Sequence, residues 1–480
     1  RDPRLVPVRN ALAVGADGMA VEAENIRAQL RATAVTARPA TTSLIHALEN
    51  GSLEERTEAA AALEELVTCS RETGQSLAMK GACPALIELS KLDNAAAVVA
   101  ACSAMGTIGT IGANSDIVRE SGGIERLMEL LAAGSSKAVS LAAVKALSSL
   151  LLFSDQNRVV AREGGLIRIL LPMLEQPGSK TLHCEVARTL HSLSFDESAR
   201  VQIAKEGGLT VVIKGLVAGT AEWEVPVAPS SAKSPGREMS GFCLGILSNL
   251  TGSTETHRDA ADAGAVGAAI GIVAATAVYS PDMGAQGLVV LSDLASSSCG
   301  RAALLGAPAA LKLLLQLLKT MASWSRKESQ ATLAGKAAHV VFQLACDDAD
   351  AAKRLAGGGF ADPLVAVMQM RPPRDSKSAT MNAAVWACVE ETLNALVALS
   401  GLEEVRGKLL ASSGALASLI ELLQHDGHYI RAAAHGLIQE LSHSNSFGAL
   451  FKSGVMGVLV SELYEAALSG SMDSCALAAV

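Results

Sequence analysis

Apolar residues return along much of this chain at spacings of three and four, which predicts helices that each bury one face. A three-part unit recurs: a short polar segment, a glycine followed by an apolar segment, and, after a turn, a longer apolar segment. Examples of the middle segment are Ile124–Leu131 and Leu166–Leu174, and examples of the long one are Val139–Leu152 and Leu182–Phe195. The pattern therefore predicts an all-helical chain of three-helix repeats.

The recurring glycine gives the period of the repeat. It is found at nine positions, namely Gly81, Gly122, Gly164, Gly207, Gly264, Gly306, Gly358, Gly414 and Gly454. Successive positions are 41, 42, 43, 57, 42, 52, 56 and 40 residues apart, so most gaps are close to 42 and three are longer. Glycine adopts a positive φ without a Cβ clash. We therefore expect each of these glycines to form the corner between a first and a second helix.

Three helices per unit of about 42 residues is the armadillo pattern, and the chain resembles that family, which includes beta-catenin and importin-alpha. Glu120–Leu131 and Ser413–Leu423 come closest to the family's recurrent phrase. The resemblance implies a right-handed superhelix, an α-α solenoid of about ten three-helix repeats. HEAT repeats stack in the same way with two helices each, and the short polar segment before each glycine favours armadillo.

The resemblance extends over residues 43–468, which we expect to form the solenoid. Residues 1–42 are then an N-terminal extension, and residues 469–480 a C-terminal tail. The three long gaps predict insertions near residues 218–237, 320–330 and 371–380, each between a second and a third helix.

Composition narrows the class of protein. Half of the residues are hydrophobic, yet only 3% are aromatic and 18% charged, so alanine and leucine supply most of the apolar surface. Both have high helix propensity and suit closely stacked helices. The net charge of −8 argues against general nucleic-acid binding, which needs a basic surface. The longest apolar run, Ala265–Tyr279, is too short to span a membrane.

The nine cysteines bear on location. They are scattered, odd in number and without a Cys-x-x-Cys pair, which favours reduced thiols in a reducing compartment. We expect a cytoplasmic protein. The alternative is a mitochondrial or other organellar one, because residues 1–42 are rich in Ala, Arg and Thr, although Asp17, Glu22 and Glu24 argue against a presequence.

No local motif specifies catalysis. The run Gly106–Gly112 has three glycines but lacks the Lys-Ser/Thr end of a phosphate-binding loop and follows no strand. His428, His435 and His443 are spaced as on one helix face, and we interpret them as surface histidines rather than metal ligands. We therefore expect no enzyme, no cofactor and no metal.

The resemblance also places a binding groove. In the family the third helix lines the concave side, and the importin-alpha branch carries a Trp and, four residues later, an Asn that holds a peptide main chain. The matching pairs here include Arg188 and Ser192, Gly245 and Asn249, Val289 and Asp293, and His339 and Gln343. Only Asn249 matches the Asn and no position matches the Trp, so nuclear-import cargo binding is not implied. The second column is nevertheless polar at eight of nine positions, which suggests either a solvated helix face or a partner-binding one. We take Arg188, Ser192, Asn249, Asp293, His339 and Gln343 as candidate partner-binding residues.

Two insertions contain a tryptophan in a chain that has only three. Trp223 and Trp324 are therefore further candidates, because exposed Trp is enriched at binding hot spots. The alternative is that each packs back onto its own helices.

These observations favour a non-enzymatic protein-binding scaffold or a subunit of a larger assembly. Two alternatives stay open: an adaptor or substrate receptor of a catalytic complex such as a ubiquitin ligase, and an organellar helical-repeat factor associated with RNA. The first would need a catalytic partner, and the second a basic concave face.

Overall fold

The computed structural model describes residues 38–69, 75, 78, 81–112, 114–223, 234–323, 328–373, 378–442 and 447–461. These residues form helices and the turns between them, and none of them lies in a strand. The all-α class predicted from the apolar spacing is therefore confirmed. Trp324 and His443, both singled out above, fall outside the described residues.

The helices have the following bounds. In the first half of the chain they are α3 Arg38–Asn50, α4 Leu53–Cys69, α6 Ala82–Ser90, α7 Ala95–Gly109, α8 Asn114–Glu120, α9 Gly123–Ala132, α10 Lys137–Leu152, α11 Asp155–Glu163, α12 Leu166–Glu175, α13 Lys180–Leu193, α14 Glu197–Lys205, α15 Gly208–Thr220 and α16 Pro235–Thr251. In the second half they are the 3₁₀ helix η4 Thr254–Thr256, α17 His257–Asp262, α18 Ala265–Thr276, α19 Pro281–Ala295, α20 Ser298–Gly306, α21 Pro308–Ala322, α22 Glu328–Ala345, α23 Ala349–Gly357, α24 Ala361–Met368, α25 Ala379–Leu399, α26 Glu403–Ala411, α27 Ser413–Leu423, α28 His428–Ser442 and α29 Phe447–Ser453.

From α8 to α28 the helices follow in sets of three, a short first helix, a second helix and a long third helix. Counting α4 and α7, which precede these sets, the third helices are α4, α7, α10, α13, α16, α19, α22, α25 and α28. The three long gaps in the glycine spacing fall between α15 and α16, between α21 and α22, and between α24 and α25. Each is thus a junction of a second and a third helix. The predicted insertion 320–330 differs from the structure, because α21 continues to Ala322 and α22 begins at Glu328, so six of its eleven residues are helical.

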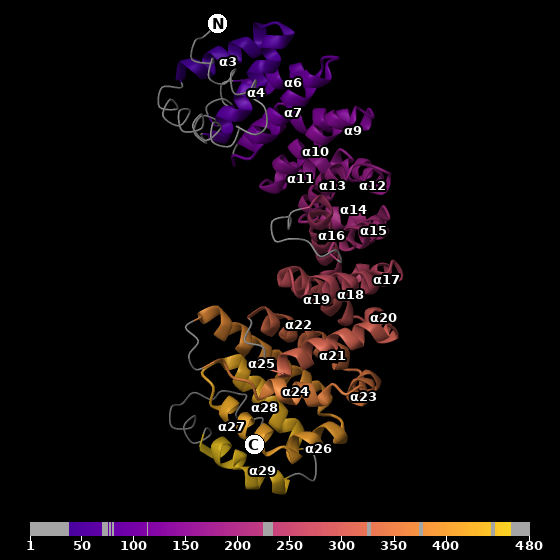
Figure 1. Cartoon of the computed structure of the whole chain (residues 1–480), viewed down its shortest axis with the longest axis vertical. Helices are drawn as coiled ribbons and strands as arrows, with labels where there is room; N and C mark the ends of the chain where they lie inside the picture. The colour runs from indigo at the N-terminus through magenta and orange to yellow at the C-terminus, as the bar shows by residue number, and fades with distance from the viewer. Residues whose placement is uncertain are drawn as a thin grey trace. The chain divides into compact units, whose positions relative to one another are not determined.

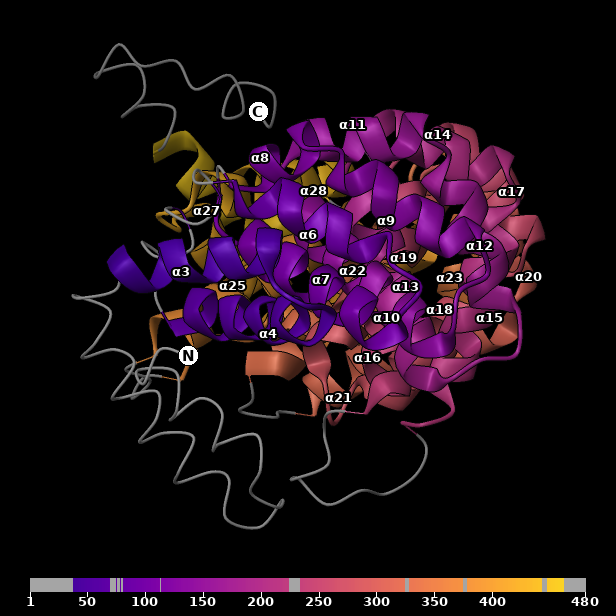
Figure 2. The same cartoon turned by 90° about the horizontal axis from the view of Figure 1, so that it is seen from above.

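The chain divides into two compact units, Arg1–Gly215 with Pro229–Ile246, and Leu216–Ala228 with Leu247–Val480. In the first unit each third helix packs on the next, in the order α4, α7, α10 and α13 (Figure 1). Seen from above, α8 and α11 lie along one side of this unit, and α7 and α10 along another (Figure 2). In the second unit α19, α22, α25 and α28 pack in the same consecutive way, as do the second helices α18, α21, α24 and α27. Each unit is therefore a stack of repeats.

Small residues let the third helices approach closely. Gly106 and Gly109 of α7 lie against Ala146 and Leu150 of α10, and a Cβ built on Gly106 would come within 2.8 Å of the Ala146 Cα. The glycine-rich run 106–112 is therefore a packing surface at the end of α7 together with a turn at Gly112.

The predicted glycine corners are confirmed at five of the nine positions. Gly81, Gly122, Gly207, Gly264 and Gly454 have φ between 76° and 93°. The prediction was wrong for the remaining four. At two of them the neighbouring glycine, Gly165 or Gly359, takes the positive φ in place of Gly164 or Gly358.

The other two corners use different residues. Gly306 ends α20, and the chain turns at the extended Ala307 before Pro308 begins α21. Gly414 lies inside α27, whose N-cap is Ser412, with its hydroxyl accepting from the Ala415 N–H. Proline at the first helical position and serine at the N-cap therefore replace the positive φ at these corners.

Valine at position 165 should lower the free energy of unfolding by about 2 kcal/mol, because Gly165 has φ 87° and β-branched residues are strained there. Chemical denaturation would measure it. The matched control is Gly271→Val in α18, where nothing lies within 4 Å of the added Cβ and φ is not positive. Equal losses in the two variants would argue against the corner assignment.

A second repeated contact, which the sequence analysis missed, joins five of the first helices (α11, α14, α17, α20 and α26) to the third helix before each of them. Arg200 donates to Ser194 O and Phe195 O at 3.1 and 3.2 Å, and Arg406 to Ser400 O and Gly401 O at 2.7 and 2.8 Å. Equivalent donors are Arg158, His257 and Arg301. Carbonyls at a helix C-terminus lack intrahelical partners, so these side chains cap the third helices.

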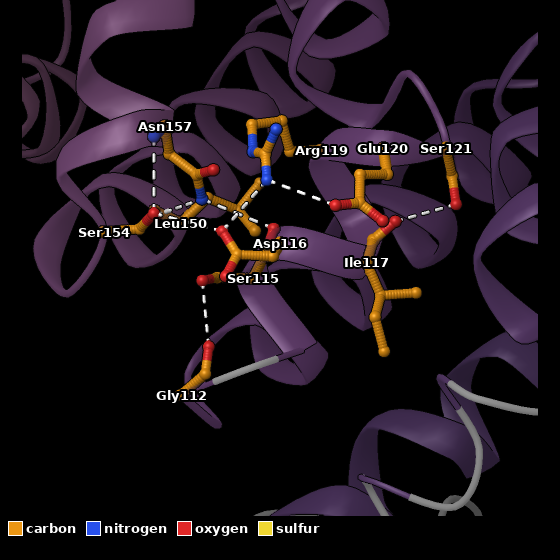
Figure 3. Close-up of polar contacts among 10 residues, drawn as sticks. All are labelled: Gly112, Ser115, Asp116, Ile117, Arg119, Glu120, Ser121, Leu150, Ser154 and Asn157. Atoms are coloured by element: carbon orange, nitrogen blue, oxygen red, sulfur yellow. Dashed lines mark hydrogen bonds and ion pairs between the residues drawn. The ribbon is translucent and has the colours of Figure 1, made fainter.

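Figure 3 shows how the same junction links consecutive repeats. The fully buried Asn157 amide at the start of α11 donates to Leu150 O of α10 at 2.9 Å and to Ser115 O of α8 at 3.3 Å. Ser154 caps α11 and donates to the Asp116 carboxylate of α8 at 3.3 Å. First helices of adjacent repeats are thus tied by polar contacts as well as by apolar packing.

Among the described residues, no single helix is long and apolar enough to cross a membrane. Two pairs of helices meet that test only when taken together, and each pair is bent, by 81° and 84°.

Candidate protein-binding face

The candidate residues of the sequence analysis all lie on third helices, apart from the two tryptophans. Arg188 and Ser192 belong to α13, Asn249 to α16, Asp293 to α19, and His339 and Gln343 to α22. All are half-buried except Ser192, which is 1% exposed and donates to Arg188 O within its own helix at 3.2 Å. We call the exposed and half-buried residues of the third helices the third-helix face.

In the second unit this face carries a polar track. The Thr251 hydroxyl donates to the Asp293 carboxylate at 3.3 Å. His339 Nδ1 lies 2.7 Å from Glu391 Oε2 of α25, and its Nε2 lies 3.5 Å from the Gln343 amide nitrogen. The structure thus brings His339 next to Gln343 and adds Glu391, which the register of single helices did not reveal.

Three carboxyl groups on this face have raised pKa values. Burial is the main cause that raises the pKa of Glu64 on α4, of Asp293 on α19 and of Glu390 on α25, and the neighbouring Glu391 raises the pKa of Glu390 further. By contrast, hydrogen bonding to Arg168 holds the pKa of Glu206, between α14 and α15, below its usual value. Burial thus outweighs the nearby lysines, Lys145 for Glu64 and Lys336 for Asp293, which lower the pKa of these two groups.

In the first unit the face carries an aromatic cluster instead. The His191 ring centroid lies 4.9 Å from that of Phe195 on the same chain segment and 6.0 Å from that of Phe242 on α16. Gly245 makes room for this imidazole, since a Cβ there would lie 2.5 Å from His191 Nε2. The Arg188 guanidinium stacks over Phe242 at 5.1 Å. We call Arg188, His191, Phe195 and Phe242 the aromatic–arginine cluster.

The first unit has only three aromatic residues of the Phe, Tyr and Trp type, and none of them is in its core. Phe153 is 67% exposed and Phe195 49%, and Phe242 is half-buried. Phenylalanine is normally among the most buried residues. The absence of phenylalanine from the alanine- and leucine-based core, together with the position of Phe195 and Phe242 beside α13, makes this place a candidate interaction surface.

The Arg188 guanidinium is held near two carboxylates but is not saturated by them. Its Nε lies 3.6 Å from Glu185 Oε2, and its Nη2 lies 3.8 Å from Glu238 Oε2. Both distances exceed those of a normal hydrogen bond, and among the described residues Arg188 Nε has no hydrogen-bond partner. Arg188 Nε is itself buried, whereas the Arg188 side chain as a whole is 41% exposed. An acceptor from another molecule can therefore reach this guanidinium only through its terminal nitrogens.

The insertion candidates are only partly described. Trp223 is half-buried in the turn after α15, where its backbone N–H donates to the Thr220 carbonyl oxygen at 2.9 Å. At the third insertion, Arg371 forms an ion pair with Glu421 of α27 at 3.0 Å and stacks over Trp386 at 5.6 Å. This arginine therefore fixes the base of its insertion.

The described ranges contain no group of three His, Cys, Asp or Glu side chains arranged to hold a metal ion. The interpretation of the C-terminal histidines as surface residues is confirmed for the exposed His428 and wrong for His435, which is 7% exposed because it lies on the packed side of α28. A shallow depression of about 390 Å³ is lined by Pro281, Asp282, Glu328, Ser329 and Thr332 at the start of α19 and α22.

Comparison with known proteins supports the fold. No protein-family model matches the sequence, and no curated protein matches it. An engineered protein solved by the Northeast Structural Genomics Consortium superposes with a TM-score of 0.73 at 19% identity, over 92% of this chain and 97% of its own. A structure from work on "a conserved phosphorylation switch" that "controls the interaction between cadherin and beta-catenin" superposes with a TM-score of 0.53 at 14% identity, over 91% and 97%. Together with the stacked repeats, these likenesses show that the chain is an all-α solenoid.

Proposed function

We propose that this protein is a non-enzymatic, armadillo-type scaffold that binds a protein partner through its third-helix face. The observation that carries the proposal is the aromatic–arginine cluster on α13 and α16. In a chain with 3% aromatic residues, this cluster sets exposed and half-buried phenylalanines beside an arginine whose side chain is 41% exposed.

The chemistry of the cluster fits a protein interface better than a small-molecule site. Aromatic residues and arginine are the residue types enriched in interfaces and at hot spots. Stacking of Arg188 over Phe242 orients the guanidinium before a partner arrives, so less side-chain entropy is lost on binding. A helical repeat array also offers an extended surface that suits a long partner segment.

Alanine at position 195 should weaken binding by about 2 kcal/mol, because it removes the most exposed aromatic ring of the cluster. Partners captured by the wild-type chain would be identified by mass spectrometry, produced in pure form and titrated calorimetrically. The matched control is Val201→Ala on α14, an apolar residue 39% exposed on a first helix. If the two changes have equal effects on affinity, the cluster is not the binding surface.

The insertion edge is a second candidate surface, and Trp223 and Trp324 are its proposed anchors. It is supported by Val278 and Tyr279, which lie at another junction of a second and a third helix and are 81% and 74% exposed. Trp223→Ala should weaken partner binding by about 2 kcal/mol and leave the thermal unfolding curve nearly unchanged. A lower melting temperature with unchanged affinity would instead show that Trp223 packs back onto its own helices.

The two alternative functions, a ligase adaptor and an RNA-associated factor, can each be tested separately. A ligase adaptor would co-purify with a catalytic subunit, and an RNA-associated factor would bind RNA with strong salt dependence. The described third helices favour neither, since their half-buried carboxyl groups oppose RNA binding. We also propose a reducing compartment such as the cytoplasm. Seven cysteines have side chains that the structure describes; all seven are free thiols and five of them are buried.

A further inference from the structure

The third-helix face changes its charge near the aromatic–arginine cluster. On α4 it presents Glu64 and Glu65, and on α25 Glu390 and Glu391. On α10 and α13 it presents cations instead, because Lys145 and Arg188 occupy the same register position in consecutive repeats. The chain as a whole has a net charge of −8, so this is a local reversal.

The negative charges around Arg188 do not cancel this reversal at the surface. The Glu185 side chain is only 11% exposed and its Oε2 lies 3.6 Å from Arg188 Nε, whereas the Arg188 side chain is 41% exposed. Glu238 is 41% exposed, but its carboxylate is 3.8 Å from Arg188 and makes only a long ion pair. A partner carboxylate at normal hydrogen-bond distance would interact more strongly with Arg188 than Glu238 does.

Lys145 supplies a second cation one repeat away. It is exposed on α10, and no ion pair with it is present in the described part of the chain; its charge acts on Glu64, whose pKa it lowers against the larger effect of burial. Neighbouring helices pack at about 8–10 Å, so Lys145 and Arg188 are spaced to contact two acidic residues of one partner segment.

An apolar rim lies next to these cations. Phe153 follows α10 and Phe195 follows α13, so both rings stand at the C-terminal ends of consecutive third helices. Leu152 beside them is 46% exposed. The rim could receive bulky apolar side chains while the cations hold the neighbouring carboxylates.

We propose that the aromatic–arginine cluster binds an acidic–apolar segment of the partner protein. One carboxylate accepts hydrogen bonds from Arg188, a second lies against Lys145, and an adjacent bulky apolar side chain packs on Phe195. This inference rests on the proposed function and adds the chemistry of the partner to it.

The test uses the full chain and three pools of fluorescent synthetic peptides with equal length and equal apolar content. The first pool combines Glu and Asp with Leu, Phe and Trp, the second replaces the acids with Lys and Arg, and the third with Gln and Ser. Fluorescence anisotropy should show the acidic pool binding at least tenfold more tightly than either of the others. Added salt should weaken that preference.

Two variants locate the site. Arg188→Gln should reduce affinity for the acidic pool about tenfold, whereas Lys205→Gln, which removes an exposed cation from the first helix α14, should leave it unchanged. A basic or neutral pool that binds as tightly as the acidic one would overturn the inference, as would equal effects of the two variants. If Phe195→Ala lowers the affinity for the captured partner while Arg188→Gln does not, the proposed function stands and the acidic–apolar inference fails.

Discussion

Leucine in place of Gly106 should lower the free energy of unfolding by about 3 kcal/mol. A Cβ at this position would lie 2.8 Å from the Ala146 Cα and 3.1 Å from its Cβ, so the clash is with the neighbouring helix itself. Backbone cannot move aside as a flexible side chain can, and overpacking of this kind is strongly destabilising. Because α7 and α10 are consecutive third helices, the two helices would be forced apart along the stack.

The matched control is Gly267→Leu in α18, a helical glycine with nothing within 4 Å of the added Cβ. It should be neutral or stabilise the protein by up to about 1 kcal/mol, because glycine is a poor helix former. Urea denaturation followed by circular dichroism measures both. Similar losses in the two variants would contradict the close approach of α7 to α10.

Methionine in place of Arg406 should lower the free energy of unfolding by about 3 kcal/mol as well. The guanidinium makes two charge-assisted hydrogen bonds to the carbonyls of Ser400 and Gly401 at the C-terminal end of α25. Removing it leaves those carbonyls without their cap, and hydrogen bonds to charged groups contribute about 1.5–3 kcal/mol each. Methionine keeps the length of the apolar stem, so the change isolates the polar contacts.

Arg354→Met on α23 is the comparison variant for this change. Arg354 is exposed on the first helix of the preceding repeat, in the described part of the chain, and contributes no cap to α22. Its replacement should change stability by less than about 0.5 kcal/mol, as is usual for surface positions. An unfolding free energy that falls equally in both variants would show that the Arg406 contacts do not cap α25.

The repeat itself was predictable because it rests on local spacing. Apolar periodicity gave the helices, and the glycine ladder gave their period. Which of two adjacent glycines takes the positive φ was not predictable, because each has its own structural reason to be glycine. At the N-cap of α12 the positive φ falls on Gly165, whereas Gly164 gives room to the preceding repeat, since a Cβ there would lie 2.8 Å from Met128 Cε of α9. That contact depends on the preceding repeat, which a local pattern does not describe.

The candidate site was predicted only in part. The register argument gave Arg188, but Phe242 and Glu391 act through contacts between helices of different repeats. A sequence trace of the cluster does exist: Phe153 and Phe195 are separated by one repeat length, as are Arg158 and Arg200. Spacing of chemically similar residues at the repeat period, rather than of glycines alone, would have revealed both the rim and the helix caps.

Site-specific photo-crosslinking tests the central claim most directly. A photoreactive phenylalanine analogue at position 195 lies in the aromatic–arginine cluster, just after α13, and the same analogue at position 201 lies on the exposed side of the first helix α14. The account predicts that illumination in cells attaches a defined partner protein to position 195, and that position 201 gives no such product. Equal products at the two positions, or a partner attached only at position 201, would contradict it.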